Sequence, residues 1–171
     1  MENSNIFYDK FIFYDKLLKN QFNEDEQLDI VSKDPSYIMH MFDASIKVQK
    51  EAILKDPNTI RYIRDQSFEI NMFALKKGCL LKYIKEPTVN MEFEAIKKNP
   101  INIVYSNYNS SFYGKELLDL AIECNAIAMI IESLKINDCD KSKATLDKLC
   151  DRQYTKYLEE EKLKCRKKWF W

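Results

Sequence analysis

The segments that decide the fold are QLDIVSKDPSYIMHMFD (27–43), QKEAILKDPNTIRYIRD (49–65), NMFALKKGCLLKYIKE (71–86) and EFEAIKKNPINIVYS (92–106). They are copies of one pattern, because Ala52, Ala74 and Ala95 recur at spacings of 22 and 21 residues. Ile30 takes the equivalent position in the first copy. A repeat of this length is typical of arrays in which each copy is one small structural unit.

A helix-capping residue stands at the same register in every copy. These residues lie seven positions before the repeated small residue and are Asn23, Ser45, Ser67 and Thr88. Their side-chain oxygens can accept a hydrogen bond from an unpaired N–H group in the first turn of a helix. Asn23 and Glu26 together form a variant of the capping box. We therefore expect a first helix of about ten residues after each cap.

A turn signal ends each of these first helices. It is Asp34-Pro35, Asp56-Pro57 and Asn99-Pro100 in copies one, two and four, and Gly78-Cys79 in copy three. Asp or Asn before Pro favours the start of a new helix, whereas Gly favours a left-handed helix end. Each copy is therefore predicted to be a helical hairpin whose second helix has about seven residues.

Two positions of the second helix are also in register. One is apolar and holds Ile38, Ile60, Leu81 and Ile103; the other holds His40, Tyr62, Tyr83 and Tyr105. One hairpin of this size cannot bury its apolar positions alone, so neighbouring copies must pack on each other. The only histidine of the chain thus occupies an aromatic position, and we expect His40 to be partly buried by packing rather than catalytic.

The predicted fold class is all-α, a short α-solenoid of stacked helical hairpins with N- and C-terminal capping helices, in a single domain spanning 1–171. Its parts are an N-terminal cap (1–22, with a helix over 5–21), four repeats (23–106), an insertion with a degenerate fifth repeat (107–137) and a C-terminal helix with its tail (138–171). In the fifth repeat Ala121 takes the small-residue position and Asn125 the turn. The last helix is expected from Lys141 to about Lys168. One face of it is predicted to carry Leu146, Leu149, Cys150, Tyr154, Tyr157, Leu158 and Cys165.

The repeat pattern resembles the short helical-hairpin repeats of unknown function found in bacterial, phage and giant-virus proteins. The resemblance covers residues 23–106 and, more weakly, 115–134, and Ala52, Ala74, Ala95, Tyr62 and Tyr83 carry it most clearly. It implies an all-helical stacked fold and no catalytic residues. The pair Gly78-Cys79 and the insertion before the fifth repeat depart from the pattern.

The composition offers little support for an enzyme. The chain has two glycines, one histidine and five cysteines without a CxxC motif, so it lacks a phosphate-binding loop and a His-rich metal site. Runs of acidic residues such as 159–161 are usually solvated helix faces. We therefore expect no enzyme activity, no cofactor and no bound metal.

The location of the protein follows from what the N-terminus lacks. MENSNIFYDKF contains no basic segment followed by an apolar one, and no apolar run reaches the length of a membrane span. Widely spaced cysteines are typical of a reducing compartment. We expect a cytoplasmic protein without a transmembrane segment.

The first candidate binding feature is a column of lysines at the end of each first helix. Its members are Lys33, Lys55, Lys77 and Lys98. Stacking would align them into a positive stripe that can follow a phosphate backbone. The alternative is a structural role, because cations are stabilised at a helix C-terminus by roughly 0.3–1 kcal/mol each. The formal net charge of zero gives no global attraction to nucleic acid.

The second candidate feature is the basic and aromatic tail. It comprises Arg166, Lys167, Lys168, Trp169, Phe170 and Trp171. Such a cluster can contact a protein partner, stack on bases or lie at an anionic membrane surface. It can equally fold back to cover the last helix.

These observations predict a non-enzymatic protein-binding module whose partner is a protein or ribonucleoprotein complex. By analogy with phage and virus repeats, the narrower expectation is a phage-encoded inhibitor of a host defence complex, similar to an anti-CRISPR protein. The alternative is RNA or single-stranded nucleic-acid binding through the lysine column and the tail.

Overall fold

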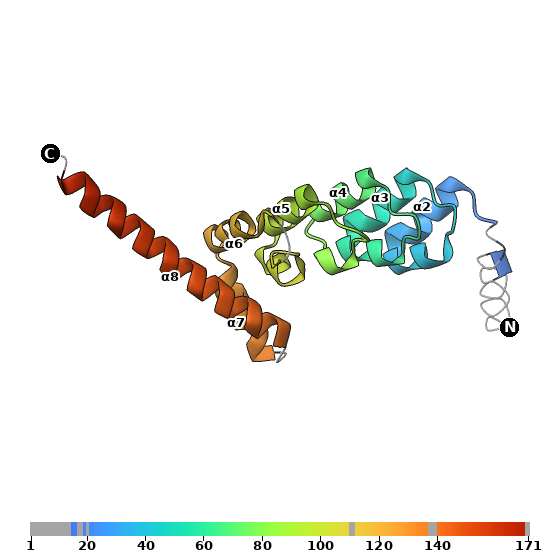
Figure 1. Cartoon of the computed structure of the whole chain (residues 1–171). Helices are drawn as coiled ribbons and strands as arrows, with labels where there is room; N and C mark the ends of the chain where they lie inside the picture. Colours follow the sequence, from blue (N-terminus) through green and yellow to red (C-terminus); the bar gives the residue numbers. More distant parts are fainter. Residues whose placement is uncertain (1–14, 17–18, 20, 110–111, 137–139, 170–171) are drawn as a thin grey trace. The chain divides into compact units, whose positions relative to one another are not determined.

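The computed structural model describes the backbone of residues 15–16, 19, 21–109, 112–136 and 140–169, and the side chains of these residues except 132–136, 158 and 161–169. Within these ranges every regular element is a helix and no strand occurs (Figure 1). The predicted all-α class is confirmed. Most of the predicted N-terminal helix over 5–21 lies outside the described residues.

The first helices of the four copies start where their caps predict. They are α2 (Glu24–Lys33), α3 (Ile46–Lys55), α4 (Phe68–Lys76) and α5 (Val89–Lys98). The side chains of Asn23, Ser45, Ser67 and Thr88 each accept a hydrogen bond from a backbone N–H of the first turn. Asn23 and Glu26 exchange both bonds of the capping box, at 2.9 and 3.0 Å. Local capping chemistry thus fixes the start of each helix.

The second helices differ from the prediction in kind and length. They are 3-10 helices, η1 (Pro35–His40), η2 (Pro57–Tyr62), η3 (Leu81–Tyr83) and η4 (Pro100–Tyr105). Three of them have six residues rather than about seven, and η3 has three. The short period leaves little chain between the proline and the next cap, which suits the tighter 3-10 helix. In copy three Gly78 is left-handed (φ 96°) and replaces the Asp-Pro start.

Of the residues predicted to cap the second helices, Asn99 holds the N-cap position but makes no capping hydrogen bond. Asp34 and Asp56 accept hydrogen bonds from the N–H groups of Ser36 and Asn58, both at 2.9 Å. Asn99 stands at the same register but makes no such bond, and its Oδ1 is buried without a partner. A shared register therefore places Asn99 before the proline without fixing the direction of its side chain.

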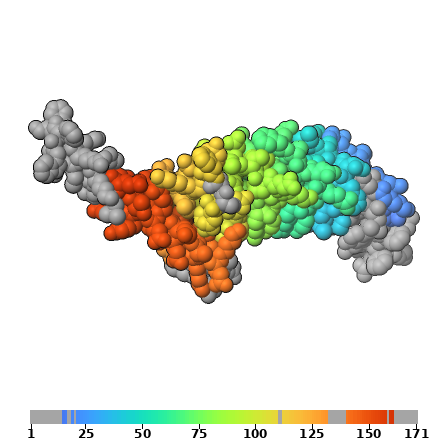
Figure 2. All heavy atoms as spheres, in the orientation of Figure 1, coloured from blue at the N-terminus to red at the C-terminus, as the bar shows by residue number. Residues whose placement is uncertain are grey.

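The chain forms two compact units, residues 1–79 with 83–85 (unit 1) and residues 80–82 with 86–171 (unit 2). In unit 1, α2 packs on α3, α3 packs on α4, and η1 packs on η2. The side chains of successive hairpins form adjoining bands on the surface of this unit (Figure 2). The fully buried apolar residues of unit 1 are Val31, Val48, Ala52, Ile53, Ile60, Ile70, Ala74, Leu75 and Cys79.

Unit 2 is built from α5 and η4 with three further helices. These are α6 (Gly114–Glu123), α7 (Ala126–Ile136) and α8 (Asp140–Trp169). Its core contains Ile96, Ile103, Val104, Tyr108, Leu117, Ala121, Ala126, Ile130 and Leu149. As predicted, Ala121 is buried, and Asn125 forms a left-handed turn at φ 64°. The second helix of this fifth copy is an 11-residue α-helix, so the copy is degenerate in its geometry as well as its sequence.

Helix α8 starts and ends within one residue of the prediction, but its predicted apolar face is only partly buried. Leu149 is fully buried and Leu146 is half-buried, whereas Cys150, Tyr154 and Tyr157 are exposed. Leu146 and Leu149 belong to the core of unit 2 and Tyr154 and Tyr157 do not, so only the first part of the helix is packed there. The side chains of Leu158 and Cys165 lie outside the described residues. Across the described part of the chain, no helix is both long and apolar enough to cross a membrane.

Candidate binding surfaces

Three lysines of the predicted column lie at the ends of neighbouring helices in unit 1, and two of these three are paired with carboxylates. Lys33, Lys55 and Lys77 are exposed at the ends of the neighbouring helices α2, α3 and α4. Lys33 pairs with Asp29 at 2.5 Å and Lys55 with Glu51 at 3.9 Å, each one helical turn away. The ammonium of Lys77 lies 5.5 Å from the centre of the Phe73 ring. The column therefore offers less bare positive charge than the sequence alone indicates.

The other predicted site residues belong to unit 2 or lie outside the described part of the structure. Lys98 is exposed at the end of α5 in unit 2. Arg166, Lys167, Lys168 and Trp169 continue the backbone of α8, and their side chains lie outside the described part of the structure. Phe170 and Trp171 lie outside it altogether.

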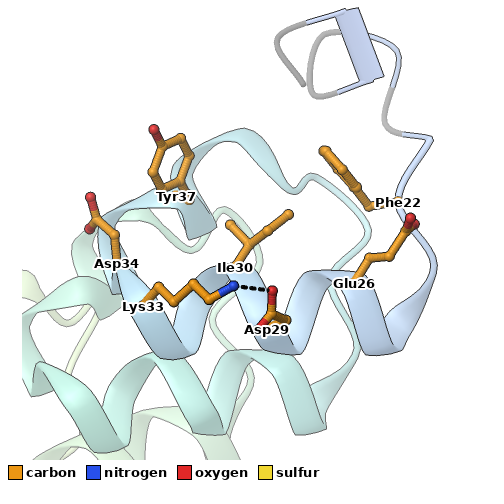
Figure 3. Close-up of a pocket in the computed structure, with 7 residues that line it drawn as sticks. All are labelled: Phe22, Glu26, Asp29, Ile30, Lys33, Asp34 and Tyr37. Carbon is orange, nitrogen blue, oxygen red and sulfur yellow. Dashed lines mark hydrogen bonds and ion pairs between the residues drawn. The ribbon is translucent and has the colours of Figure 1, made fainter. Parts of the chain in front are cut away.

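A pocket of about 340 Å³ opens on the outer side of the first hairpin (Figure 3). It is lined by Phe22, Glu26, Asp29, Ile30, Lys33, Asp34 and Tyr37. The residues that replace Glu26, Ile30 and Tyr37 in copy two are all buried; they are Val48, Ala52 and Thr59. The equivalent positions of copy one therefore line an open pocket instead of a buried contact among the described residues.

The expectation for His40 is wrong, because this residue is exposed rather than partly buried. Among the described aromatic contacts it has the Tyr37 ring, with the two ring centres 6.2 Å apart. Tyr83, at the same register, is half-buried, and the guanidinium of Arg61 from the preceding copy lies over its ring.

An apolar surface that sequence reasoning missed lies on the outer side of α3 and α4; we call it the α3–α4 surface. Three large apolar side chains on it, Ile46, Leu54 and Phe68, are 48%, 49% and 61% exposed. Two shallow hollows lie between them and share Lys50. Lys50 pairs with Glu69 across the two helices at 2.5 Å. The signal in the sequence was that these apolar residues fall outside the register of the buried positions.

A second missed feature is the arginine–tyrosine cluster of Arg61, Tyr62 and Tyr83 in unit 1. The guanidinium of Arg61 donates to the hydroxyls of Tyr62 (2.8 Å) and Tyr83 (3.4 Å). Its central carbon lies 4.6 and 5.4 Å from the centres of the two rings. The hydrogen bond that Arg61 donates to Tyr83, followed by the one to Tyr62, raises the pKa of Arg61 above its usual range. Nearby in sequence, Arg64 lies over the exposed Phe42 ring at 4.3 Å.

The groups that could carry covalent or metal chemistry are sparse in the described residues. No cluster of three or more His, Cys, Asp or Glu side chains there is arranged to hold a metal ion. Cys79 is fully buried, and burial, with a smaller effect of the Asp56 charge, raises its pKa to about 12. The thiolate is the nucleophilic form of cysteine, so Cys79 is inert at neutral pH.

Comparison with protein-family models, curated proteins and solved structures finds no match to this chain. The resemblance to short helical-hairpin repeats therefore stays a prediction from the sequence.

Proposed function

We propose that the chain is a protein-binding module built on a short α-solenoid, and that its partner docks on the α3–α4 surface. The observation that carries the proposal is the exposure of Ile46, Leu54 and Phe68 on two helices that pack side by side. Contiguous apolar surface with polar residues around it is a recurrent feature of protein interaction sites.

Burial of this surface supplies favourable free energy. Each of the three side chains is about half exposed, so a partner that covers it gains roughly 1 kcal/mol per residue from the hydrophobic effect. Lys47, Lys50 and Lys76 surround the apolar residues and form a polar rim. An apolar centre with a charged rim is the usual anatomy of a protein interface.

The solenoid supports this surface in a defined way. The caps hold the first helices in one register, and buried alanines such as Ala52 and Ala74 allow neighbouring helices to approach closely. Ser45 of the second copy also donates to Glu24 of the first at 2.5 Å. Repeats of this kind present side chains from successive copies on one extended surface.

Nucleic-acid binding through the lysine column has weaker support. Two of its three lysines in unit 1 are paired with carboxylates, and the chain has no net charge. A phosphate backbone would have to displace those carboxylates. The narrower idea of an inhibitor directed at a defence complex stays a prediction that awaits the identity of the partner.

The proposal is tested by capturing partners of the tagged full chain from its source cells, with and without nuclease. Phe68→Asp is compared with Tyr154→Asp, which places the same charge at a similarly exposed aromatic position on α8. We expect a protein partner that survives nuclease, is lost with Phe68→Asp and is retained with Tyr154→Asp. Both variants should unfold at the temperature of the wild type, because neither residue is buried.

Two results would contradict the proposal. Capture that disappears with nuclease indicates nucleic-acid binding instead. Capture that is equal for Phe68→Asp and the wild type removes the α3–α4 surface as the docking site.

A further inference from the structure

Arg61 differs from the other cations of unit 1 in its surroundings. The ion pairs among the described residues of this unit are all made by lysines, namely Lys16, Lys19, Lys33, Lys47, Lys50 and Lys55. Arg61 is exposed, and it donates hydrogen bonds to the hydroxyl groups of Tyr62 and Tyr83. Its positive charge is therefore held in place without being neutralised.

The two tyrosines fix the direction of the Arg61 side chain. Tyr62 is its neighbour in η2, and Tyr83 comes from the next copy of the repeat. Tyr83 is itself held by the rest of unit 1, because its carbonyl oxygen accepts a hydrogen bond from Gln66 Nε2 at 3.0 Å. Arg61 has more N–H donors than these hydroxyls occupy, and a guanidinium in a fixed orientation loses less entropy when it binds a planar anion.

We propose that Arg61, held by Tyr62 and Tyr83, is a recognition site for a carboxylate on an acidic segment of a protein partner. This inference deepens the proposed protein-binding function and rests on it. The guanidinium forms two parallel hydrogen bonds to one carboxylate, and the tyrosine rings flank the bound side chain. Arg64, stacked on Phe42, adds a second stacked cation three residues along the chain.

The surroundings favour separate carboxylates over a continuous phosphate backbone. Arg64 lines a hollow together with Asp43 and Asp65, so negative charge lies next to this cation. Glu86 follows at the same register in copy three. Acidic residues in copies one to three repel a polyanion that runs along these repeats, whereas a short acidic segment can reach Arg61 and avoid them.

The site can be tested by fluorescence anisotropy with the full chain. The probes are a fluorescein-labelled polyglutamate peptide and a labelled oligothymidylate of equal net charge. We expect the peptide to bind, and Arg61→Gln to weaken its binding about tenfold, the loss that follows from removing hydrogen bonds to a charged group. Arg61→Lys should also weaken binding, because the charge remains but the paired donors are lost.

Lys148→Gln is the matched control, because it removes one exposed positive charge from α8. It should leave peptide binding within about twofold of the wild type, because a single exposed charge outside the site is screened at physiological salt. Tyr83→Phe tests the positioning role, since it removes the hydroxyl but keeps the ring. We expect it to weaken peptide binding less than Arg61→Gln does.

Three outcomes would overturn the site. The first is that Arg61→Gln and the wild type bind the peptide equally well. The second is that Arg61→Gln and Lys148→Gln lose peptide affinity to the same extent. The third is that oligothymidylate binds more tightly than the peptide and depends on Arg61 in the same way. The last outcome would assign the site to nucleic acid. Failure of the site is distinguishable from failure of the protein-binding proposal, because the latter is measured by capture with Phe68→Asp and does not depend on Arg61.

Discussion

The carboxamide of Asn102 accepts a hydrogen bond from the backbone N–H of Leu81 at 2.8 Å. The same side chain donates to the carbonyl oxygen of Ala95 at 3.1 Å. Asn102 is completely buried, so neither backbone group has water as an alternative partner. One side chain of η4 thereby joins the start of η3 to the end of α5 within unit 2.

Replacing Asn102 with Leu is expected to lower the free energy of unfolding by roughly 1–3 kcal/mol, because the buried N–H of Leu81 loses its partner. The carbonyl oxygen of Ala95 keeps its other hydrogen bond, from the backbone N–H of Asn99 at 2.8 Å. Urea denaturation followed by circular dichroism measures the loss. The control is Asn90→Leu on the exposed side of α5, which should change stability by less than about 0.5 kcal/mol. Equal stabilities of the two variants would contradict this role of Asn102.

The two glycines of the chain are predicted to resist substitution for different reasons. An alanine at Gly78 has open space around its Cβ but must adopt φ 96°, which costs roughly 1–2 kcal/mol. An alanine at Gly114 has ordinary backbone angles, but its Cβ would overlap the carbonyl oxygen of Tyr108. We expect Gly114→Ala to lower the melting temperature more than Gly78→Ala.

A second substitution at each position separates the two explanations. Gly78→Asn should be milder than Gly78→Ala, because asparagine tolerates left-handed angles. Gly114→Asn should be no better than Gly114→Ala, because any Cβ meets the same carbonyl. Comparison of the four melting temperatures checks both statements, and a milder Gly114→Asn would show that backbone angles limit this position too.

The features that could be predicted from the sequence depend on residues close together in the chain. Capping by Ser45, the left-handed Gly78 and the burial of Ala52 each follow from one register of a short repeat. Such features are governed by local backbone chemistry and by the helical period, so they are visible without a structure.

The features that could not be predicted depend on which copy lies next to which. His40 and Ile30 share their registers with residues that are more buried in other copies, so burial does not follow from the register alone. The contact of Arg61 with Tyr83 joins residues in different copies, and no local pattern pairs them. The packing of α4, which carries Phe68, on α3 likewise joins two copies, although the exposure of Phe68 agrees with its position outside the buried register.

Burial of Cys79 has a consequence for stability at alkaline pH. The thiol has a pKa of about 12 in the folded chain against an ordinary value of 9.0. Above about pH 9 the unfolded chain therefore releases this proton and the folded chain keeps it, so the stability present below pH 9 is lost as the pH rises toward 12.

Removing the thiol should remove this part of the pH dependence. Between about pH 8 and pH 10, we expect wild-type stability to fall by up to roughly 1 kcal/mol more than that of Cys79→Ala. Urea denaturation at both pH values gives the comparison. Cys150→Ala, at an exposed cysteine, serves as the control and should follow the wild type; a wild-type curve parallel to that of Cys79→Ala would refute the effect.

The attachment of α8 to α6 is expected to depend on one of two neighbouring ion pairs. Arg152 donates to both carboxylate oxygens of Asp119, at 2.7 and 2.8 Å, and the two side chains are 13% and 25% exposed. Lys156 makes a single bond to Glu123 at 3.1 Å, with side chains 33% and 62% exposed. Paired hydrogen bonds away from water are stronger than a single solvated contact.

Arg152→Met should therefore lower the free energy of unfolding by roughly 1.5–3 kcal/mol, because it leaves the Asp119 carboxylate without its paired donors. Lys156→Met should cost less than about 1 kcal/mol. Arg152→Lys should recover only part of the loss, since lysine keeps the charge but cannot make the paired bonds. Chemical denaturation ranks the three variants. An Arg152→Met variant no less stable than Lys156→Met would mean that α8 is held by the packing of residues such as Leu146 and Leu149, and that the Arg152–Asp119 pair contributes nothing to its attachment.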